Sequence, residues 1–445
     1  MSMNRSNSLD ALRGFAILAM VLSSSIAFGI LPGWMYHAQT PPPSHQFNPA
    51  LPGLTWVDLV FPFFLFSMGA AIPLALRKKT SAFKVSGHIL LRYALLVFFA
   101  VFTLHARAWV QSPGPGWTEQ LVSIACFILL SFMFIRTESR WMLLFKIAAF
   151  AAGIVFLYLQ PGFDIYKSDV IIIVLANMAF FGSAAWWLTR RHPLVRIGIL
   201  PFIVAIFIAE GWAQELFSWS PLPWMYKFYY LKYLFIIIPG TFAGEWLLLQ
   251  TPEQTEADKR KWMLMAACAL LLVIVNLVGL QSRWLLVNLS LSVAIGTFML
   301  VLSNRISAPV RSWKNFLQAG IYLLWLGLCF DSTQGGIKKD PSNYAYYFVT
   351  GGLAFLVLLG FCILEHFGRA TAAIRYLAAN GRNPMVAYVT GNLLLLPLLH
   401  LTGAIQLFSA LENNVWLGVL RGLLFTGIVS VVTIFFVNRK WYWKT

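Results

Sequence analysis

Charged residues are scarce in this 445-residue sequence, and their scarcity excludes an ordinary soluble protein. Asp, Glu, Lys and Arg make up 11% of the chain, whereas soluble domains contain about 25%. Hydrophobic residues make up 59%, and many apolar runs approach the roughly 20 residues that cross a bilayer. The sequence therefore predicts an all-α polytopic membrane protein that is surrounded by a lipid bilayer.

Cysteine is also rare, and the few cysteines that occur are not arranged for covalent or metal chemistry. All four lie in apolar runs, with no CxxC pair and no Cys/His spacing typical of a zinc site. Buried thiols behave as small apolar side chains. We therefore expect neither a disulfide framework nor a bound metal. The four are Cys126, Cys268, Cys329 and Cys362.

Acidic residues are half as common as basic ones, which gives the chain a formal net charge of +17. A nucleic-acid partner would explain such an excess, but the basic residues cluster in loops between alternate apolar runs, such as 77–79, 190–191 and 259–261. This is the distribution of the positive-inside rule. It predicts two cytoplasmic termini, an inner-membrane location and no nucleic-acid binding. No small-residue cleavage site follows the first run, so residues 8–30 are expected to remain as the first helix.

The apolar runs predict about fourteen helices, or twelve if two short runs do not span the bilayer. We find no repeat and no segment suited to a soluble domain, so residues 1–445 are expected to form one integral-membrane domain. The runs lie at 8–30, 55–76, 88–106, 119–135, 142–159, 168–189, 194–211, 228–249, 262–280, 285–303, 315–331, 344–364, 383–401 and 414–437.

The first eighty residues contain a helix pair joined by a loop, residues 31–54, that has the composition of a catalytic site. Six prolines stiffen this loop, which contains His37 and His45. Asp58 follows at the outer end of the second apolar run. Histidine is the usual general base near neutral pH. The alternative is an interfacial loop whose histidines only bond to headgroups or backbone.

Other ionisable and amide side chains are candidates for binding an anionic group. Near the start of the first run, Asp10 and Arg13 share a helix face and form either a ligand site or a structural ion pair. In the C-terminal block, 331–445, the candidate cations and amides could contact phosphate, or could belong to solvated turns and a membrane anchor. They are Lys338, Lys339, Arg382, Asn383, Lys440 and Lys444.

Three segments together resemble the heparan-α-glucosaminide N-acetyltransferase family and its bacterial relatives of the DUF5009 type. The first is S-L-D-A-L-R-G, residues 8–14, followed by W-M-Y-H-A at 34–38 and by G-L-T-W-V-D-L-V-F-P-F-F-L-F-S-M-G at 53–69. The second joins I-K-K-D-P-S-N-Y to A-N-G-R-N-P-M-V-A-Y, and the third is R-K-W-Y-W-K near the C-terminus. The three segments cover about a third of the chain.

The resemblance implies that acetyl-CoA from the cytosol donates its acetyl group to an amino sugar at the opposite membrane face. A loop histidine serves the transfer, either as a base or as an acyl acceptor. We assign this role to His37, which the H-A dipeptide favours, and place His45 second, although its distance from Asp58 in sequence is closer to the family spacing. Ser24 stands where the family has an asparagine late in the first helix.

Two other classes of protein compete with this interpretation. A secondary transporter of a sugar or another small solute would suit twelve to fourteen helices, but such transporters tend to contain repeats. A structural subunit or flippase of cell-envelope synthesis is the third possibility. Binding of acetyl-CoA separates an acyltransferase from both. The sequence does not identify the acceptor sugar, and it leaves open whether the protein works as a homodimer.

Overall fold

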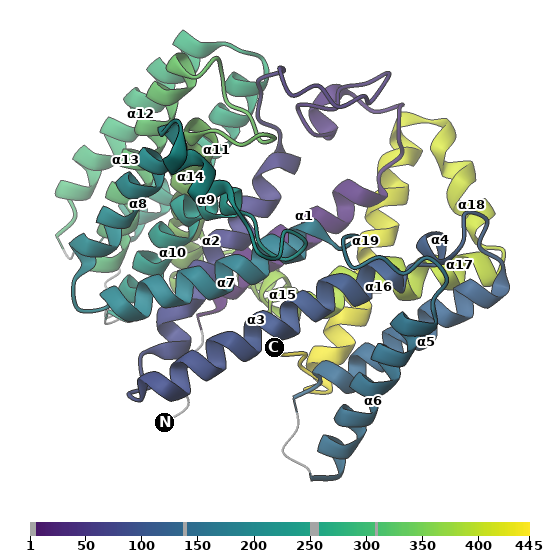
Figure 1. The fold of residues 1–445 in the computed structure, drawn as a ribbon. Helices are drawn as coiled ribbons and strands as arrows, with labels where there is room; N and C mark the ends of the chain where they lie inside the picture. Colours follow the sequence, from purple (N-terminus) through teal and green to yellow (C-terminus); the bar gives the residue numbers. More distant parts are fainter. Residues whose placement is uncertain (1–5, 137–139, 250–257, 308–309) are drawn as a thin grey trace. The chain divides into compact units, whose positions relative to one another are not determined.

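The computed structural model of the protein describes residues 6–136, 140–249, 258–307 and 310–445. These residues form helices joined by loops, with no β-strand in the described ranges (Figure 1). Apolar residues dominate the helices, and a helix satisfies its own backbone hydrogen bonds, as the interior of a bilayer requires. The predicted all-α membrane architecture is confirmed.

Within the described residues, twelve helical segments are long and apolar enough to cross a membrane. This number lies at the lower end of the predicted range. The segments are α1 (Asn7–Ser25), α2 (Trp56–Leu76), α3 (Ala82–His105), α5 (Trp117–Phe134), α6 (Arg140–Leu159), α7 (Val170–Thr189), α11 (Lys259–Gln281), α12 (Leu285–Asn304), α13 (Arg311–Thr333), α14 (Tyr344–His366), the segment Pro384–Leu401 and α19 (Val415–Asn438).

The two remaining predicted runs form shorter helices. The run at 194–211 becomes α8 (Pro193–Ile208), and the run at 228–249 is divided between η2 (Phe228–Tyr233) and α10 (Leu234–Trp246). At 1.5 Å per residue, helices of 16 and 13 residues are shorter than the roughly 30 Å hydrocarbon layer. The other short helices are η1 (Gly33–Met35), α4 (Ala108–Gln111), α9 (Trp212–Ser218), α15 (Thr371–Gly381), α18 (Ile405–Ala410) and η5 (Leu411–Asn413).

The chain folds into two compact units, and each unit contains segments from both halves of the sequence. The first unit comprises Met1–Arg77 and Phe235–Gly381, and the second comprises Lys78–Leu234 and Arg382–Thr445. The helix pair α1–α2 therefore folds with α10 to α15. The residues of the predicted catalytic loop all lie in the first unit.

The first unit is built around α14. Of the residues in its most apolar window, 89% are buried, and α14 packs against α13, α11, α1 and α2 (Figure 1). A helix that is apolar on every side is expected to be buried by other helices. Glycines allow the closest approach, since a Cβ atom added at Gly352 would lie 2.6 Å from the backbone nitrogen of Leu324.

A second close approach fixes the start of α1 against α15. A Cβ atom added at Gly14 would lie 1.8 Å from the carbonyl oxygen of Leu377, and one at Gly381 would lie 1.8 Å from that of Asp10. Only glycine fits at either position, and small residues are what allow membrane helices to pack this closely. This contact sets the position of Asp10 and Arg13.

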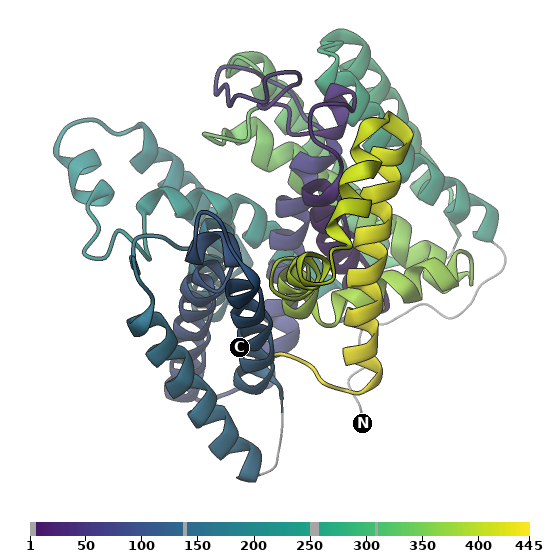
Figure 2. The ribbon, with the colours of Figure 1, turned by 90° about the vertical axis from the view of Figure 1, so that its right-hand side faces the viewer.

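The second unit contains two pairs of neighbouring helices and a C-terminal segment that returns to one of them. Helices α3 and α7 pack side by side (Figure 1), and α5 packs against α6. The segment Pro384–Leu401 consists of α16 (Pro384–Thr390), a π-helical turn η4 (Gly391–Leu395) and α17 (Leu396–Leu401). After α19 the chain leaves the helix as a tail (Figure 2), and the backbone nitrogen of Lys444 donates to the carbonyl of Phe134 at the end of α5.

Candidate active site

The loop between α1 and α2 is fixed to the end of α1 by Tyr36. Its phenolic hydroxyl donates to the carbonyl of Ala27 at 2.7 Å and accepts from the backbone nitrogen of Leu31 at 3.1 Å. Tyr36 is buried, so its ring anchors the loop from inside. The residue that follows is His37, whose carbonyl accepts from the backbone nitrogen of Thr40 at 3.0 Å. His37 is therefore positioned by a tight turn, not by a mobile stretch of loop.

Asp58 lies in the first turn of α2, where its carboxylate is surrounded by donors. One oxygen, Oδ2, accepts from the backbone nitrogens of Thr55 at 3.0 Å and Ala38 at 3.2 Å. Thr55 and Asp58 form a capping box at the start of the helix, an arrangement that satisfies free backbone donors. The side chain of Asp58 is only 2% exposed. Its position is thus set both by the helix terminus and by the loop that it holds.

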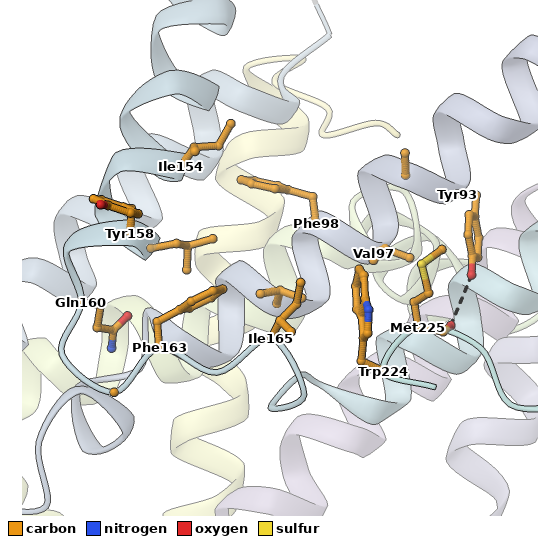
Figure 3. Close-up of a pocket in the computed structure, with 14 residues that line it drawn as sticks. Tyr93, Val97, Phe98, Ile154, Tyr158, Gln160, Phe163, Ile165, Trp224 and Met225 are labelled. Atoms are coloured by element: carbon orange, nitrogen blue, oxygen red, sulfur yellow. Dashed lines mark hydrogen bonds between the residues drawn. The ribbon is translucent and has the colours of Figure 1, made fainter. Parts of the chain in front are cut away.

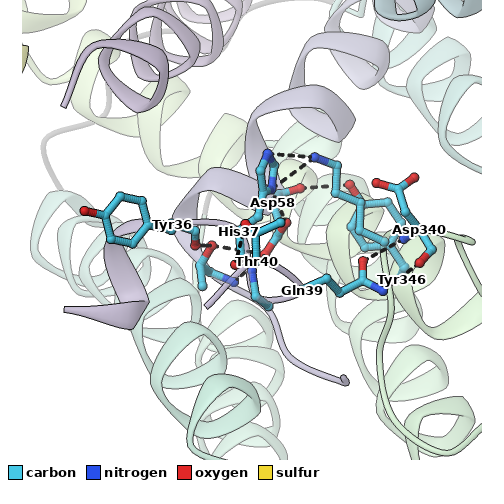
Figure 4. Close-up of polar contacts among 10 residues, drawn as sticks. Tyr36, His37, Gln39, Thr40, Asp58, Asp340 and Tyr346 are labelled. Atoms are coloured by element: carbon cyan, nitrogen blue, oxygen red, sulfur yellow. Dashed lines mark hydrogen bonds and ion pairs between the residues drawn. The ribbon is translucent and has the colours of Figure 1, made fainter. Parts of the chain in front are cut away.

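The other carboxylate oxygen of Asp58 contacts the imidazole of His37. His37 Nδ1 lies 2.7 Å from Asp58 Oδ1 (Figure 4), and the His37 side chain is 40% exposed. A carboxylate only accepts hydrogen bonds, so Nδ1 must carry the proton of this contact. In the neutral ring, Nε2 is then the nitrogen with a free lone pair. The structure thus pairs a buried carboxylate with an accessible histidine.

Lys339 approaches the same imidazole from a loop that is distant in sequence. Its Nζ lies 3.2 Å from each ring nitrogen of His37, across 302 residues of sequence. Because Nδ1 donates to Asp58, the ammonium can donate only to Nε2. The site therefore contains a base, a carboxylate that orients it and a fixed positive charge.

The loop that carries Lys339 is attached to the histidine loop by paired hydrogen bonds. Gln39 Nε2 donates to the carbonyl of Asp340 at 2.6 Å, and the backbone nitrogen of Asp340 donates to Gln39 Oε1 at 2.8 Å (Figure 4). The backbone nitrogen of Gly53 also donates to the carbonyl of Ile337 at 2.9 Å. Tyr346, on α14, also contacts this group: its hydroxyl donates to the carbonyl of Asp58 at 2.9 Å.

His45, the second candidate base, occupies a different environment. Its ring lies 3.9 Å from the ring of Phe28 and 4.6 Å from that of Tyr36, measured between centroids. Both of its nitrogens are buried and have no hydrogen-bond partner among the described residues. The structure thus brings His37 to Asp58 and places His45 in an aromatic stack.

The other candidates in the first unit are held by local contacts. Arg13 pairs with Asp10 at 3.3 Å and also donates to the carbonyls of Ser67 and Gly381, so it connects α1 with α2 and with the end of α15. Ser24 donates to the carbonyl of Val21 within its own helix at 2.9 Å. Lys338 is half-buried, and its backbone nitrogen donates to Asn343 Oδ1.

The remaining candidates lie in the second unit, where Asn383 holds the C-terminal tail. Asn383 Nδ2 donates to the carbonyl of Trp441 at 2.9 Å, and its Oδ1 accepts from the backbone nitrogen of Trp443 at 3.1 Å. Trp443 is buried. The tail therefore holds Lys440 and Lys444 on the same side of the unit as the segment that contains Arg382 and Asn383.

Three positioning residues escaped the sequence analysis, namely Gln39, Thr55 and Tyr346. The pattern Thr55-x-x-Asp58 before an apolar run is typical of a capping box and could have identified Thr55. Nothing local predicts the partners of Gln39 or Tyr346. Among the described residues, no group of three or more His, Cys, Asp or Glu side chains could hold a metal ion.

The N-terminal half of the chain matches a known protein family. A family model described as a domain of unknown function, DUF5009, matches residues 5–247, which is more than half of the chain. The matched range includes His37 and Asp58 but neither Lys339 nor the C-terminal block. No curated protein matches the chain.

Proposed function

The chain belongs to the DUF5009 family, and we propose that it is a membrane-embedded acyltransferase. It transfers an acetyl group from cytosolic acetyl-CoA to the amine of an amino sugar of the glucosamine type at the extracytoplasmic face. In this proposal the protein resides in the inner membrane of a bacterium. The observation that carries the proposal is the 2.7 Å contact between an accessible His37 and a buried Asp58.

His37 has the arrangement that a general base needs. Asp58 accepts the proton on Nδ1, the role that the carboxylate has in other histidine sites. The lone pair of Nε2 becomes available once the Lys339 ammonium, 3.2 Å away, turns toward the developing oxyanion. In the transfer, Nε2 takes a proton from the ammonium group of the acceptor, and the neutral nitrogen attacks the thioester carbonyl. The carbon–sulfur bond then breaks, and the second nitrogen proton passes to the CoA thiolate. The products are the N-acetyl sugar, free CoA and one proton, which Nε2 releases to water.

Lys339 supplies a positive charge where the reaction develops a negative one. Attack on the thioester places an anionic charge on the carbonyl oxygen, and fixed donors at that point are usually a large part of catalysis. The ammonium of Lys339 lies 3.2 Å from His37 Nε2, which is close to where the reacting nitrogen must sit. We therefore assign Lys339 to the stabilisation of this oxyanion, in place of the contact with CoA phosphates, which the sequence does not favour over a solvated turn.

The test of this proposal is acetyl transfer by the purified protein in detergent. Incubation with acetyl-CoA and glucosamine should release free thiol and N-acetylglucosamine in equal amounts. A secondary transporter, the main alternative, would have no reason to bind acetyl-CoA. A protein that binds the sugar but not acetyl-CoA would overturn the proposal.

We expect the C-terminal tail to contribute to donor binding. Several phosphate charges of CoA need cations, and we expect the two exposed lysines together to contribute about 1.5–3 kcal/mol, the value of one charge-assisted hydrogen bond. Replacing Lys440 and Lys444 together by glutamate should therefore raise the Kd for acetyl-CoA by about tenfold to a hundredfold, measured by titration calorimetry. A matched double variant, Lys167→Glu with Lys227→Glu, changes two exposed lysines in other loops and should leave the Kd unchanged. An unchanged Kd in the first variant would make the tail a membrane anchor only.

The proposed topology predicts that the two ends of α2 lie on opposite sides of the membrane. Basic residues follow α2 at 77–79, so this end should be cytoplasmic and the histidine loop extracytoplasmic. Ser44 and Thr80 are both exposed, so each can be replaced by a single cysteine in a cysteine-free background and treated with a thiol reagent that does not cross the membrane. In intact cells Ser44→Cys should be labelled and Thr80→Cys should not. Labelling of both, or of Thr80→Cys alone, would exclude this orientation.

A further inference from the structure

A cluster of basic residues lies in the second unit, at the end that the proposed topology places in the cytoplasm. Helices α3 and α7 pack side by side, and their ends meet here, because the Arg190 guanidinium donates to the carbonyl of Lys79 at 3.4 Å. The sequence on both sides of this contact contains no acidic residue from 78 to 92 or from 186 to 198. The α3–α7 basic cluster consists of Lys79, Lys84, His88, Arg92 and Arg190.

Three members of the cluster form one stripe along α3. Lys84, His88 and Arg92 are spaced four residues apart, so they share a face of the helix. Lys84 and His88 are exposed and Arg92 is half-buried, and beside them the apolar side chain of Leu91 is 59% exposed. Lys79 and Arg92 both act electrostatically on the His88 ring, so the positive charges lie close together. The stripe therefore faces the lipid and the water at its surface.

The stripe continues into the part of α3 that lies within the bilayer. Residues 93–104 contain no charged residue, and Tyr93, Val97 and Phe98 line an apolar pocket there (Figure 3). From Arg92 to the end of α3 at His105 the helix extends over only about 20 Å, whereas the hydrocarbon layer is about 30 Å thick. The backbone of Arg92 therefore lies inside this layer, and its long side chain extends toward the headgroups.

Arg190 adds a positive charge at the end of α7, and its side chain is held in place. Its guanidinium carbon lies 3.7 Å from the centroid of the Trp187 ring, and the same group donates to the carbonyl of Lys79. A stacked guanidinium loses little freedom when it binds an anion, and its fork of donors matches two oxygens of a phosphate. Within the described ranges of the chain, no carboxylate pairs with Lys84 or Arg190.

We propose that the α3–α7 basic cluster binds the headgroup phosphate of an anionic phospholipid in the cytoplasmic leaflet. Anionic lipids of this leaflet attract basic residues near the surface, and basic sites between membrane helices bind their headgroups. The depth of Arg92 favours a lipid over a soluble nucleotide such as CoA, because a phosphate that reaches Arg92 must lie at the bilayer surface. The choice of leaflet rests on the proposed topology, and the site is independent of the proposed acetyl transfer.

Photocross-linking in lipid nanodiscs tests this proposal on the full-length protein. The probe is a phosphatidylglycerol with a diazirine near the glycerol end of one acyl chain. A phosphatidylcholine with the same diazirine is the matched probe, and each is diluted in unlabelled phosphatidylcholine. The phosphatidylglycerol probe should label peptides 79–92 and 187–196 about tenfold more strongly than the matched probe. Replacing Lys84 and Arg92 together by glutamine should remove most of this preference, because each cation near the surface contributes about a factor of five.

The matched control replaces two cations of the second unit that lie outside the cluster. Lys146→Gln with Arg439→Gln changes residues near the cytoplasmic ends of α6 and α19, and it should leave the labelling of both peptides unchanged. Because a nanodisc offers the same lipids in both leaflets, these results depend neither on the topology nor on acetyl transfer.

Three outcomes would overturn the proposal. Equal labelling of the wild type by the two probes is the first, and it can be measured even if the double glutamine variant does not fold. An unchanged preference in Lys84→Gln with Arg92→Gln, in a protein that still elutes as a folded species, is the second. Loss of labelling on addition of free CoA, but not of unlabelled phosphatidylglycerol, is the third, and it would assign the cluster to the phosphates of CoA.

Discussion

Replacing His37 by alanine is expected to lower the turnover of acetyl transfer by about 10²–10⁴-fold, the usual contribution of a general base. Binding of acetyl-CoA should be unchanged, because His37 acts on the proton of the acceptor. The variant should also fold, since the side chain is 40% exposed and its loss leaves no cavity in a core. Turnover is measured as thiol release with glucosamine present, and binding is measured by titration calorimetry.

His45→Ala is the matched control for this prediction. His45 stacks on Phe28 and Tyr36, so its removal should loosen the loop and lower the melting temperature, with a much smaller loss of turnover. The reverse ranking of the two variants would mean that the sequence spacing to Asp58, which favours His45, was a better guide than the H-A dipeptide. If both variants keep full transfer, the histidine mechanism is wrong for this protein.

Helix positions were largely predictable because the bilayer imposes a length on every span. Fourteen apolar runs were expected, and twelve correspond to candidate spans among the described residues. The two that do not form the shorter helices α8 and α10. Internal proline alone does not explain their length, because α2 contains Pro62 and Pro73 and still extends over 21 residues. Hydropathy shows how apolar a run is, but it does not show at which residue the helix ends. The sequence also did not show that each unit combines segments from both halves of the chain. Contacts between distant segments leave no pattern in local hydropathy.

The choice between His37 and His45 could not be made from spacing, because the path of the loop is set elsewhere in the chain. His37 is 21 residues from Asp58, and the nearer candidate in sequence is His45. The loop reaches its position through Gln39, whose carboxamide binds the backbone of Asp340, 301 residues away. A long-range bond between two loops leaves no periodic pattern in either, so only the structure reveals it.

Lys339 illustrates the same limit for charged residues. In the sequence it is one of two adjacent lysines in a turn, equally suited to phosphate or to solvent. In the structure its ammonium contacts His37, and Lys338 does not share this contact. Which of two neighbouring lysines contacts His37 depends on the register of the segment. This register is fixed by the hydrogen bond that Gly53 donates to the carbonyl of Ile337 and by the one that Asp340 donates to Gln39.

Asp58→Asn is expected to lower kcat about as much as the loss of His37, by about 10²–10⁴-fold, with little change in KM for acetyl-CoA. Asparagine has the same shape as aspartate, but an NH2 group, which donates hydrogen bonds, replaces one of the two carboxylate oxygens. The backbone N–H groups of Thr55 and Ala38 and the Thr55 hydroxyl face one oxygen of this side chain, and His37 faces the other. The amide group must therefore turn toward one of them, and His37 is the one that can adapt, by moving its proton from Nδ1 to Nε2. With Nε2 protonated, the ring can no longer act as a base.

This explanation separates a positioning role from a purely structural one. Nitrogen NMR of labelled histidine should show a proton on Nδ1 of His37 in the wild type and on Nε2 in Asp58→Asn. Thr55→Val is the control, because it removes a hydroxyl that lies 2.7 Å from the carbonyl of Tyr36 and 3.0 Å from Asp58 Oδ2 but leaves a carboxylate to accept the Nδ1 proton of His37. It should destabilise the loop by about 1–3 kcal/mol without changing the tautomer. If Thr55→Val and Asp58→Asn lower the melting temperature equally, only Asp58→Asn should lose most of its turnover. Equal losses of turnover in the two variants would make Asp58 a residue that only holds the loop in place.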